Sequence, residues 1–267
     1  MTQTAVSGIH YYPIKSCAGT ALTEAVLTSR GIQHDREFML VDLDGYFLTQ
    51  REHPRMALIQ PTVTDAHLTL QAPSMTKLTI PIIKEGLTYK SVVWRSQCDV
   101  VDQGEEVAAW LNRYLQTPCR LVRMAEGFVR TVNPAFAKRP LDQVSFADGY
   151  PVLLISEASL ADLNGRLVQP LPMNRFRPNI VVSGCEPFAE DSWQQIRVGS
   201  TTFDIVKPCA RCTVTTVNQA TGEKEPKEPL ATLARYRQQA GGVMFGQNLL
   251  QQNNGRFQIG DLVEIIR

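Results

Sequence analysis

The 267-residue sequence lacks the motifs of several large enzyme classes. It contains no G-x-x-x-x-G-K-[ST] phosphate loop, no G-x-G-x-x-G dinucleotide motif, no G-x-S-x-G and no H-E-x-x-H. Histidine is scarce, and all four residues lie in the first quarter of the chain: His10, His34, His53 and His67. A histidine-rich metal site and a Ser-His-Asp triad therefore have no support.

Signals for export and for membrane insertion are also missing. The opening stretch, "MTQTAVSGIHYYPIKSC", has neither the charged start nor the continuous apolar run of a signal peptide. No segment approaches the roughly 18 apolar residues of a membrane span. Six cysteines are too few for a disulfide scaffold of this length. We expect a cytoplasmic protein with mostly free thiols and no membrane partner.

The overall charge gives no reason to expect a nucleic-acid partner. The formal net charge is only +1, so no global field would recruit nucleic acid or a membrane surface. Hydrophobic residues make up 43% of the chain and charged residues 20%, as in ordinary globular proteins. The length suits one large domain or two modest ones.

The pattern of apolar residues predicts a β-rich α+β fold with few, scattered helices. Turn residues at Asp44-Gly45 and Asp65-Ala66 separate alternating segments that read as hairpins. An apolar stripe predicts a helix over 104–116, and shorter helices are expected after Ser156 and within 228–239. Most of the remaining apolar runs read as strands, including "CTVTTV". Strands and helices do not alternate regularly, which argues against a doubly wound sheet.

A pair of cysteines in "KPCARCTVTT" is the most distinctive chemical feature of the sequence. A structural zinc site normally needs a second such pair, and a dithiol redox motif normally opens a helix. Here Cys212 precedes residues that favour a strand, and Lys207 and Arg211 would favour thiolate over thiol. Spacing alone leaves zinc, dithiol exchange, two structural cysteines and a single soft-metal ligand open.

Further cations stand next to small polar residues at predicted turns and strand ends. They occur in "YPIKSC", "HDRE", "TQRE" and "RFRPN". Side chains from such separate positions can converge on an anion such as phosphate. We hypothesise this convergence for Lys15, Ser16, Arg36, Arg51, Arg175, Arg177 and Asn179.

Long motifs in this order resemble one family. "YPIKSC", "GIQHDREFMLVD", "SEASLADLN", "RFRPNIVVSGCEPFAEDSW", "KPCARCTVTTV", "EPLATLARYR" and "FGQN" are similar to segments of MOSC-domain proteins of the YcbX and mitochondrial amidoxime-reducing type. The resemblance runs from about residue 5 to the end. It implies a MOSC N-terminal β-barrel-like domain over 1–120 packed on a MOSC β-barrel domain over 121–267, with the cofactor bound between them.

The resemblance also implies a molybdenum cofactor, molybdopterin carrying molybdenum. Cys212 matches the family's metal ligand, which leaves Cys209 as a neighbour. Asp148 matches an acidic position beside the cofactor and is the candidate proton donor, although a bound water would serve as well. Arg51 is added to the cofactor contacts on charge and position only. The remaining positions that match cofactor contacts are Lys15, Ser16, Arg36, Arg177, Asn179, Ala210 and Arg211.

The activity implied by the resemblance is reduction of small N-hydroxylated compounds to amines or amidines. The substrates would be hydroxylamines, amidoximes and N-hydroxylated nucleobases. The C-x₄-C-x₂-C spacing of a plant-type [2Fe-2S] cluster is absent, so we expect no iron–sulfur cluster in this chain. Electrons would come from a separate ferredoxin-like protein or flavin reductase. The alternative is a carrier of molybdenum cofactor or sulfur, with Cys212 holding the cargo.

Overall fold

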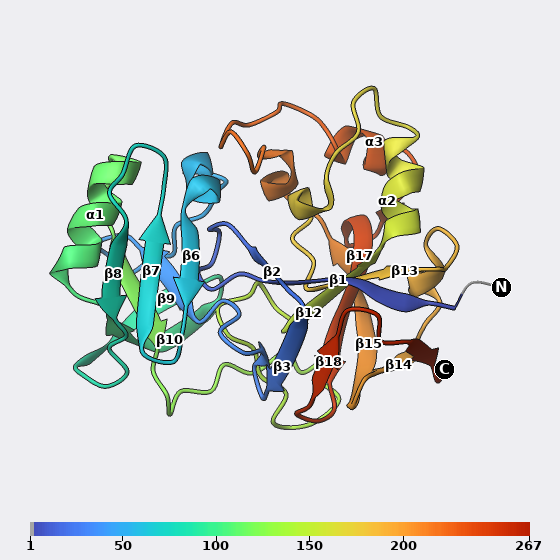
Figure 1. Ribbon diagram of the computed structural model, residues 1–267, viewed down its shortest axis with the longest axis horizontal. Coiled ribbons are helices and arrows are strands. Elements are labelled where there is room, and N and C mark those ends of the chain that lie inside the picture. The colour runs from blue at the N-terminus through green and yellow to red at the C-terminus, as the bar shows by residue number, and fades with distance from the viewer. Residues whose placement is uncertain (1–2) are drawn as a thin grey trace.

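The computed structural model describes residues 3–267, and its largest element is a nine-stranded sheet (Figure 1). β1 and β2 come from the start of the chain and extend a sheet otherwise built from its second half. In spatial order the strands are β19 (Val263–Ile265), β14 (Gln195–Val198), β15 (Thr201–Ala210), β17 (Gly242–Gln251), β12 (Val152–Ser156), β13 (Ile180–Ser183), β1 (Ala5–Tyr11) and β2 (Thr20–Leu22), with β16 (Gln238–Gln239) paired to β17.

Three smaller sheets complete the β structure. One has the order β5 (Phe38–Val41), β11 (Arg120–Met124), β10 (Ser96–Asp102) and β9 (Thr88–Val93). A second contains β6 (Gln60–Val63), β7 (His67–Gln71) and β8 (Leu78–Pro81). In the third, β18 (Arg256–Gln258) pairs with β3 (Glu24–Thr28), which pairs with β4 (Gly31–Ile32).

Helices are few and short, as the β-rich prediction required. The α-helices of the described residues are α1 (Glu105–Leu115), α2 (Glu157–Asn164) and α3 (Leu230–Ala234). Single 3₁₀ turns are η1 (Pro54–Leu58), η2 (Met173–Arg175), η3 (Ala189–Asp191) and η4 (Thr213–Thr216). In Figure 1, α1 lies beside β8 at one end of the molecule, and α2 and α3 lie together at the other. None of the described helices is long and apolar enough to span a bilayer.

Several local predictions are confirmed. The predicted stripe on α1 is buried, and Trp110 and Tyr114 stack with ring centroids 5.9 Å apart. Residues 64–66 connect β6 to β7 as a hairpin. Ser156 caps α2, where its Oγ accepts a hydrogen bond from the N–H of Ser159. Gly45 turns the chain with φ +83°, although two isolated bridges, at Tyr46 and Phe47, follow it instead of a full strand.

The strand predicted after Cys212 is wrong, and the helix predicted within 228–239 forms but is short. The stretch after Cys212 forms the 3₁₀ turn η4 and not a strand. Its threonine hydroxyls donate to the backbone oxygens three residues earlier, Thr215 to Cys212 at 2.9 Å and Thr216 to Thr213 at 2.8 Å. These local bonds outweigh the strand preference of β-branched residues. The last helix, α3, has only five residues, because the chain turns at once into β16.

The fold brings the ends of several strands to one place. β1 ends shortly before Lys15, and β5 begins two residues after Arg36. β13 begins directly after Asn179, and β15 ends two residues before Cys212. The N–H of His10 donates to the carbonyl oxygen of Asn179 at 2.9 Å, which joins β1 to the segment that precedes β13. Polar residues at these strand ends can therefore face one shared pocket.

Candidate active site

One pocket contains every residue that the sequence assigned to the site. It encloses about 830 Å³, including the space open to solvent at its mouth. The ten predicted residues that line it are Lys15, Ser16, Arg36, Arg51, Asp148, Arg177, Asn179, Ala210, Arg211 and Cys212. Two other cations considered with them lie elsewhere: Arg175 pairs with Glu225, and Lys207 covers the ring of Phe136 at 4.6 Å.

The two cysteines of the pair have different surroundings. Cys212 is half-buried and extended, and the Nη1 atom of Arg51 lies 3.8 Å from its Sγ. Cys209 instead accepts a hydrogen bond from Nη1 of Arg211 at 3.1 Å. Arg211 also donates to the carbonyl oxygen of Phe176 at 2.5 Å, but its buried Nε has no partner among the described residues. Each cysteine sulfur therefore contacts a different arginine, Cys212 with Arg51 and Cys209 with Arg211.

Arg36 and Arg177 are held on one aromatic ring. Their guanidinium carbons lie 4.1 and 4.2 Å from the ring centroid of Tyr12. Nη1 of Arg36 also donates to both carboxylate oxygens of Asp35, at 2.8 and 2.6 Å, and to Asn179 Oδ1 at 3.1 Å. Burial raises the pKa of Tyr12 to about 12, so the ring stays neutral. The sequence analysis missed Tyr12 and Asp35, although both adjoin predicted site residues.

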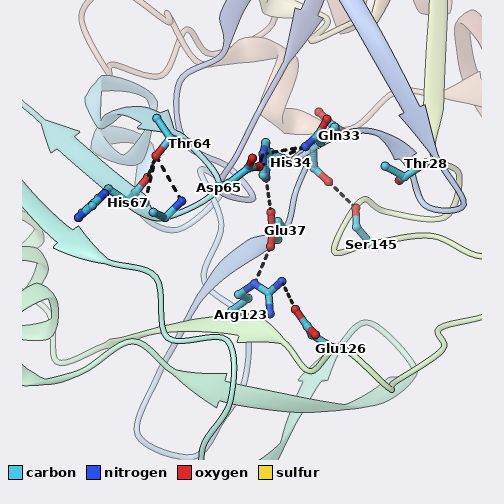
Figure 2. Close-up of polar contacts among 12 residues, drawn as sticks. Thr28, Gln33, His34, Glu37, Thr64, Asp65, His67, Arg123, Glu126 and Ser145 are labelled. Carbon is cyan, nitrogen blue, oxygen red and sulfur yellow. Dashed lines mark hydrogen bonds and ion pairs between the residues drawn. The ribbon is translucent and has the colours of Figure 1, made fainter. Parts of the chain in front are cut away.

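A network of charged residues outside the pocket lining fixes the turn that carries Arg36 (Figure 2). His34 Nδ1 contacts Glu37 at 2.7 Å, and Nε of Arg123 donates to the same carboxylate at 2.5 Å. Burial alone would raise the pKa of Glu37, but His34 and Arg123 together lower it. Ser145 Oγ donates to the carbonyl oxygen of Asp35 at 2.7 Å. This network orients the turn without lining the pocket.

Lys15 and Asp148 form a pair at the pocket. The lysine side chain is only 6% exposed, and its ammonium contacts Asp148 and donates to the carbonyl oxygen of Phe146 at 2.8 Å. Burial lowers the pKa of Lys15, while Asp148 opposes that shift. For Asp148, burial acts to raise the pKa, but Lys15 and the Trp94 N–H outweigh it and lower the pKa. Asp148 is therefore ionised at neutral pH, which favours a bound water over its carboxyl group as the proton donor.

Backbone conformation also brings pocket residues into place. Ser16, Arg36 and Arg177 all have positive φ, at 65°, 49° and 54°. Such angles are uncommon outside glycine and often mark functional sites. The backbone oxygen of Ser16 accepts a hydrogen bond from Gln50 at 2.7 Å, while Ala210 is exposed at the end of β15.

The charge of the pocket favours an anionic ligand. Five cations, Lys15, Arg36, Arg51, Arg177 and Arg211, line it together with a single carboxylate, Asp148. Buried Asp35 lies behind Arg36. Burial lowers the pKa of Arg177 to about 10, and the neighbouring Arg36 adds to the effect. The pocket and its surroundings therefore contain more positively charged side chains than carboxylates.

Comparison with known proteins places this fold and pocket in a defined class. Residues 3–118 match the MOSC N-terminal beta barrel domain, and residues 142–264 match the MOSC domain. The protein is thus a MOSC-domain protein that carries both parts.

Individual relatives narrow the class to a family. The chain is 37% identical over 279 residues to human mitochondrial amidoxime-reducing component 1, covering 98% of this chain and 82% of the relative. It is 36% identical over 277 residues to rat mitochondrial amidoxime reducing component 2, covering 97% and 82%. It belongs to the amidoxime-reducing component family. A solved structure, the YuaD protein of Bacillus subtilis, aligns over 99% of this chain and 95% of its own with 12% identity and a TM-score of 0.46.

Proposed function

We propose that this protein is a molybdenum-cofactor-dependent reductase that converts small N-hydroxylated compounds to amines or amidines. Hydroxylamines, amidoximes and N-hydroxylated nucleobases are the proposed substrates. The observation that carries the proposal is the pocket itself, in which five cations surround the half-buried thiol of Cys212. The family supports a reductase, since its members are named for the reduction of amidoximes.

The residues present fit such a cofactor. A thiolate is a soft ligand suited to molybdenum, and guanidinium groups bind phosphate through paired hydrogen bonds. The buried Nε of Arg211 has no partner within residues 3–267, and the pKa of Arg177 is lowered; a bound anion would relieve both. Cys212 would hold the metal. The residues that would hold the pterin and its phosphate are Lys15, Ser16, Arg36, Arg51, Arg177, Asn179, Ala210 and Arg211, with Asp148 beside them.

In the proposed reaction, the protein itself binds and orients the cofactor and supplies the positive charge of the pocket. The overall change consumes two electrons and two protons, and it releases water as the N–O bond breaks. When bound, the cofactor supplies the two-electron redox chemistry. Asp148 is ionised and keeps Lys15 in place, and its side chain is 67% exposed. We therefore assign the proton for the departing oxygen to solvent that reaches the pocket mouth.

Electrons must come from outside the 267 residues. Cys17, Cys98 and Cys119 are buried in apolar surroundings, and the remaining cysteines lack the spacing of an iron–sulfur site. A ferredoxin-like protein or a flavin reductase is the proposed electron donor.

The boundary between the two domains at residue 120 and the cytoplasmic location of the protein are likewise proposals.

Metal analysis of a matched pair of variants tests the proposal. The wild type, Cys212→Ala and Cys209→Ala should be purified from a host that makes molybdenum cofactor. We expect near-stoichiometric molybdenum in the wild type and in Cys209→Ala, and a loss of at least tenfold in Cys212→Ala. Each preparation is then given a reduced dye and benzamidoxime, and dye oxidation should follow the molybdenum content.

Two results would contradict the proposal. One is wild type without molybdenum, and the other is Cys212→Ala that keeps both metal and activity. A protein that retains molybdenum, reduces nothing and passes its cofactor to an apo-enzyme would instead be the carrier, the alternative function.

A further inference from the structure

A tryptophan occupies a strained backbone position beside two residues that line the pocket. Trp94 is the first of two residues that connect β9 to β10, where Val93 pairs with Ser96. Its φ is +54°, in the left-handed region that favours glycine or asparagine. A bulky residue is uncommon there, and a strained residue held by its surroundings often has a functional reason. The side chain nevertheless remains 44% exposed.

The contacts of Trp94 connect it to two residues of the pocket. The guanidinium of Arg51 lies over its ring, 4.5 Å from the centroid. Its Nε1 donates a hydrogen bond to Oδ1 of Asp148 at 3.0 Å. Phe47 packs against the indole with centroids 5.1 Å apart, and the Lys15 ammonium lies 5.5 Å from the Phe47 ring. The indole thus touches side chains that line the pocket without lining it itself.

The guanidinium of Arg51 lies between the indole of Trp94 and the sulfur of Cys212, the proposed metal ligand. One side of its guanidinium faces Trp94, and its Nη1 is 3.8 Å from Cys212 Sγ. Among the described residues, no carboxylate or carbonyl oxygen accepts a hydrogen bond from this guanidinium. Its one polar contact is with the sulfur of Cys212. Arginine has a flexible stem, so a cation without such anchors needs another contact to keep its place. The aromatic face supplies that contact.

We propose that Trp94 is a positioning residue of the pocket: its indole face holds the Arg51 guanidinium beside the sulfur of Cys212. The indole N–H at the same time keeps Asp148 turned towards Lys15. The inference deepens the proposed function, because it assigns a residue that orients the charge next to the proposed metal ligand. Its test requires neither bound cofactor nor turnover, so the two can fail separately.

The test measures the positive charge at Cys212 in cofactor-free protein. The thiol is alkylated in parallel with iodoacetate, an anion, and iodoacetamide, its neutral counterpart of similar size. Mass spectrometry of the peptide that contains Cys212 gives both rates. Their ratio reports the local charge, because access and thiolate fraction affect both reagents alike. A unit charge about 4 Å away is worth about a fivefold change even at the dielectric constant of water.

The variants separate the aromatic face from the other properties of Trp94. Trp94→Gly removes the ring and suits the positive φ, and Trp94→Leu keeps bulk without an aromatic face. Both should lower the iodoacetate-to-iodoacetamide ratio at Cys212 about fivefold, to the value of Arg51→Gln. Trp94→Phe keeps a face for Arg51 and should stay within twofold of wild type. Circular dichroism confirms that each variant is folded.

Cys209 provides the internal control. Its sulfur contacts Arg211 and not Arg51, so its ratio should change less than twofold in all variants. The proposal is overturned if both non-aromatic variants keep the wild-type ratio at Cys212. It is equally overturned if Trp94→Phe falls as far as they do, or if Arg51→Gln leaves the ratio unchanged.

Discussion

Replacing Arg130 by methionine should destabilise the protein and release the loop that carries Asp148. Arg130 is 6% exposed, and its guanidinium donates to the carbonyl oxygens of Ser145, Ala147 and Asp148 at 2.7, 2.5 and 3.0 Å. A fourth bond reaches Ser96 Oγ on β10 at 3.2 Å. Methionine fills similar space but donates none of these bonds.

The magnitude follows from two opposing effects. A hydrogen bond from a charged donor contributes about 1.5–3 kcal/mol, and three carbonyl oxygens lose one each. Burial lowers the pKa of Arg130, which shows that its charge is poorly solvated in the fold. Removing that buried charge returns several kcal/mol, as when buried ions are replaced by apolar groups. We expect a net loss of about 3 kcal/mol, or about 5–10 °C in melting temperature.

Urea denaturation of the cofactor-free protein measures this loss. Arg113→Met is the control, since Arg113 is exposed on α1 and its side chain makes none of the described hydrogen bonds. That control should stay within about 0.5 kcal/mol of wild type. Arg130→Met within 1 kcal/mol of wild type would refute the reasoning, because the loop would then be held by its own packing.

Three further predictions concern the charge of the pocket and the tightness of the fold. Inorganic pyrophosphate at about 100 times its dissociation constant should stabilise the cofactor-free protein by about 2.7 kcal/mol in thermal melts, and Arg177→Met should at least halve this gain. Because the folded-state pKa of Asp148 is lowered, its pairing stabilises above pH 4 and is lost as the pH falls further. The free-energy difference between Asp148→Asn and wild type should therefore shrink on acidification and, for a side chain 67% exposed, stay below about 1 kcal/mol. Gly246→Ala should lower the free energy of unfolding in urea by about 2 kcal/mol or more, since φ is +82° and a Cβ would lie 2.6 Å from Ile155. Gly127→Ala is the control and should not lower it, because a Cβ there meets nothing within 4 Å. Equal stabilities of the two variants would count against this.

The sequence predicted local structure well where one pattern dominated. The stripe on α1 and the turn between β6 and β7 needed no distant contacts to be recognised. The stretch after Cys212 was misjudged, because its β-branched residues favour a strand only if the threonine hydroxyls are ignored. In η4 those hydroxyls bond their own backbone, and the local geometry prevails over intrinsic preference.

The grouping of the site residues could not follow from spacing. Lys15 and Cys212 lie far apart in the sequence, and only resemblance to a family suggested that they share a pocket. Their supporting residues were missed for a related reason. Tyr12, Trp94 and Arg130 act through ring faces and carbonyl oxygens supplied by distant segments. No pattern along the sequence marks such contacts.

The pairing of β3 with β18 has a consequence for how the protein is made. Glu24 and Arg256, which pair across these strands, are 232 residues apart, and β1 likewise depends on β13. During synthesis β1 can pair with β2, and β3 with β4, soon after they leave the ribosome. Their other edges stay open until β13 and β18 have been made, and open strand edges are prone to wrong association. The last residue that lines the pocket, Asn248, lies on β17, so the pocket can form only after that strand has been made.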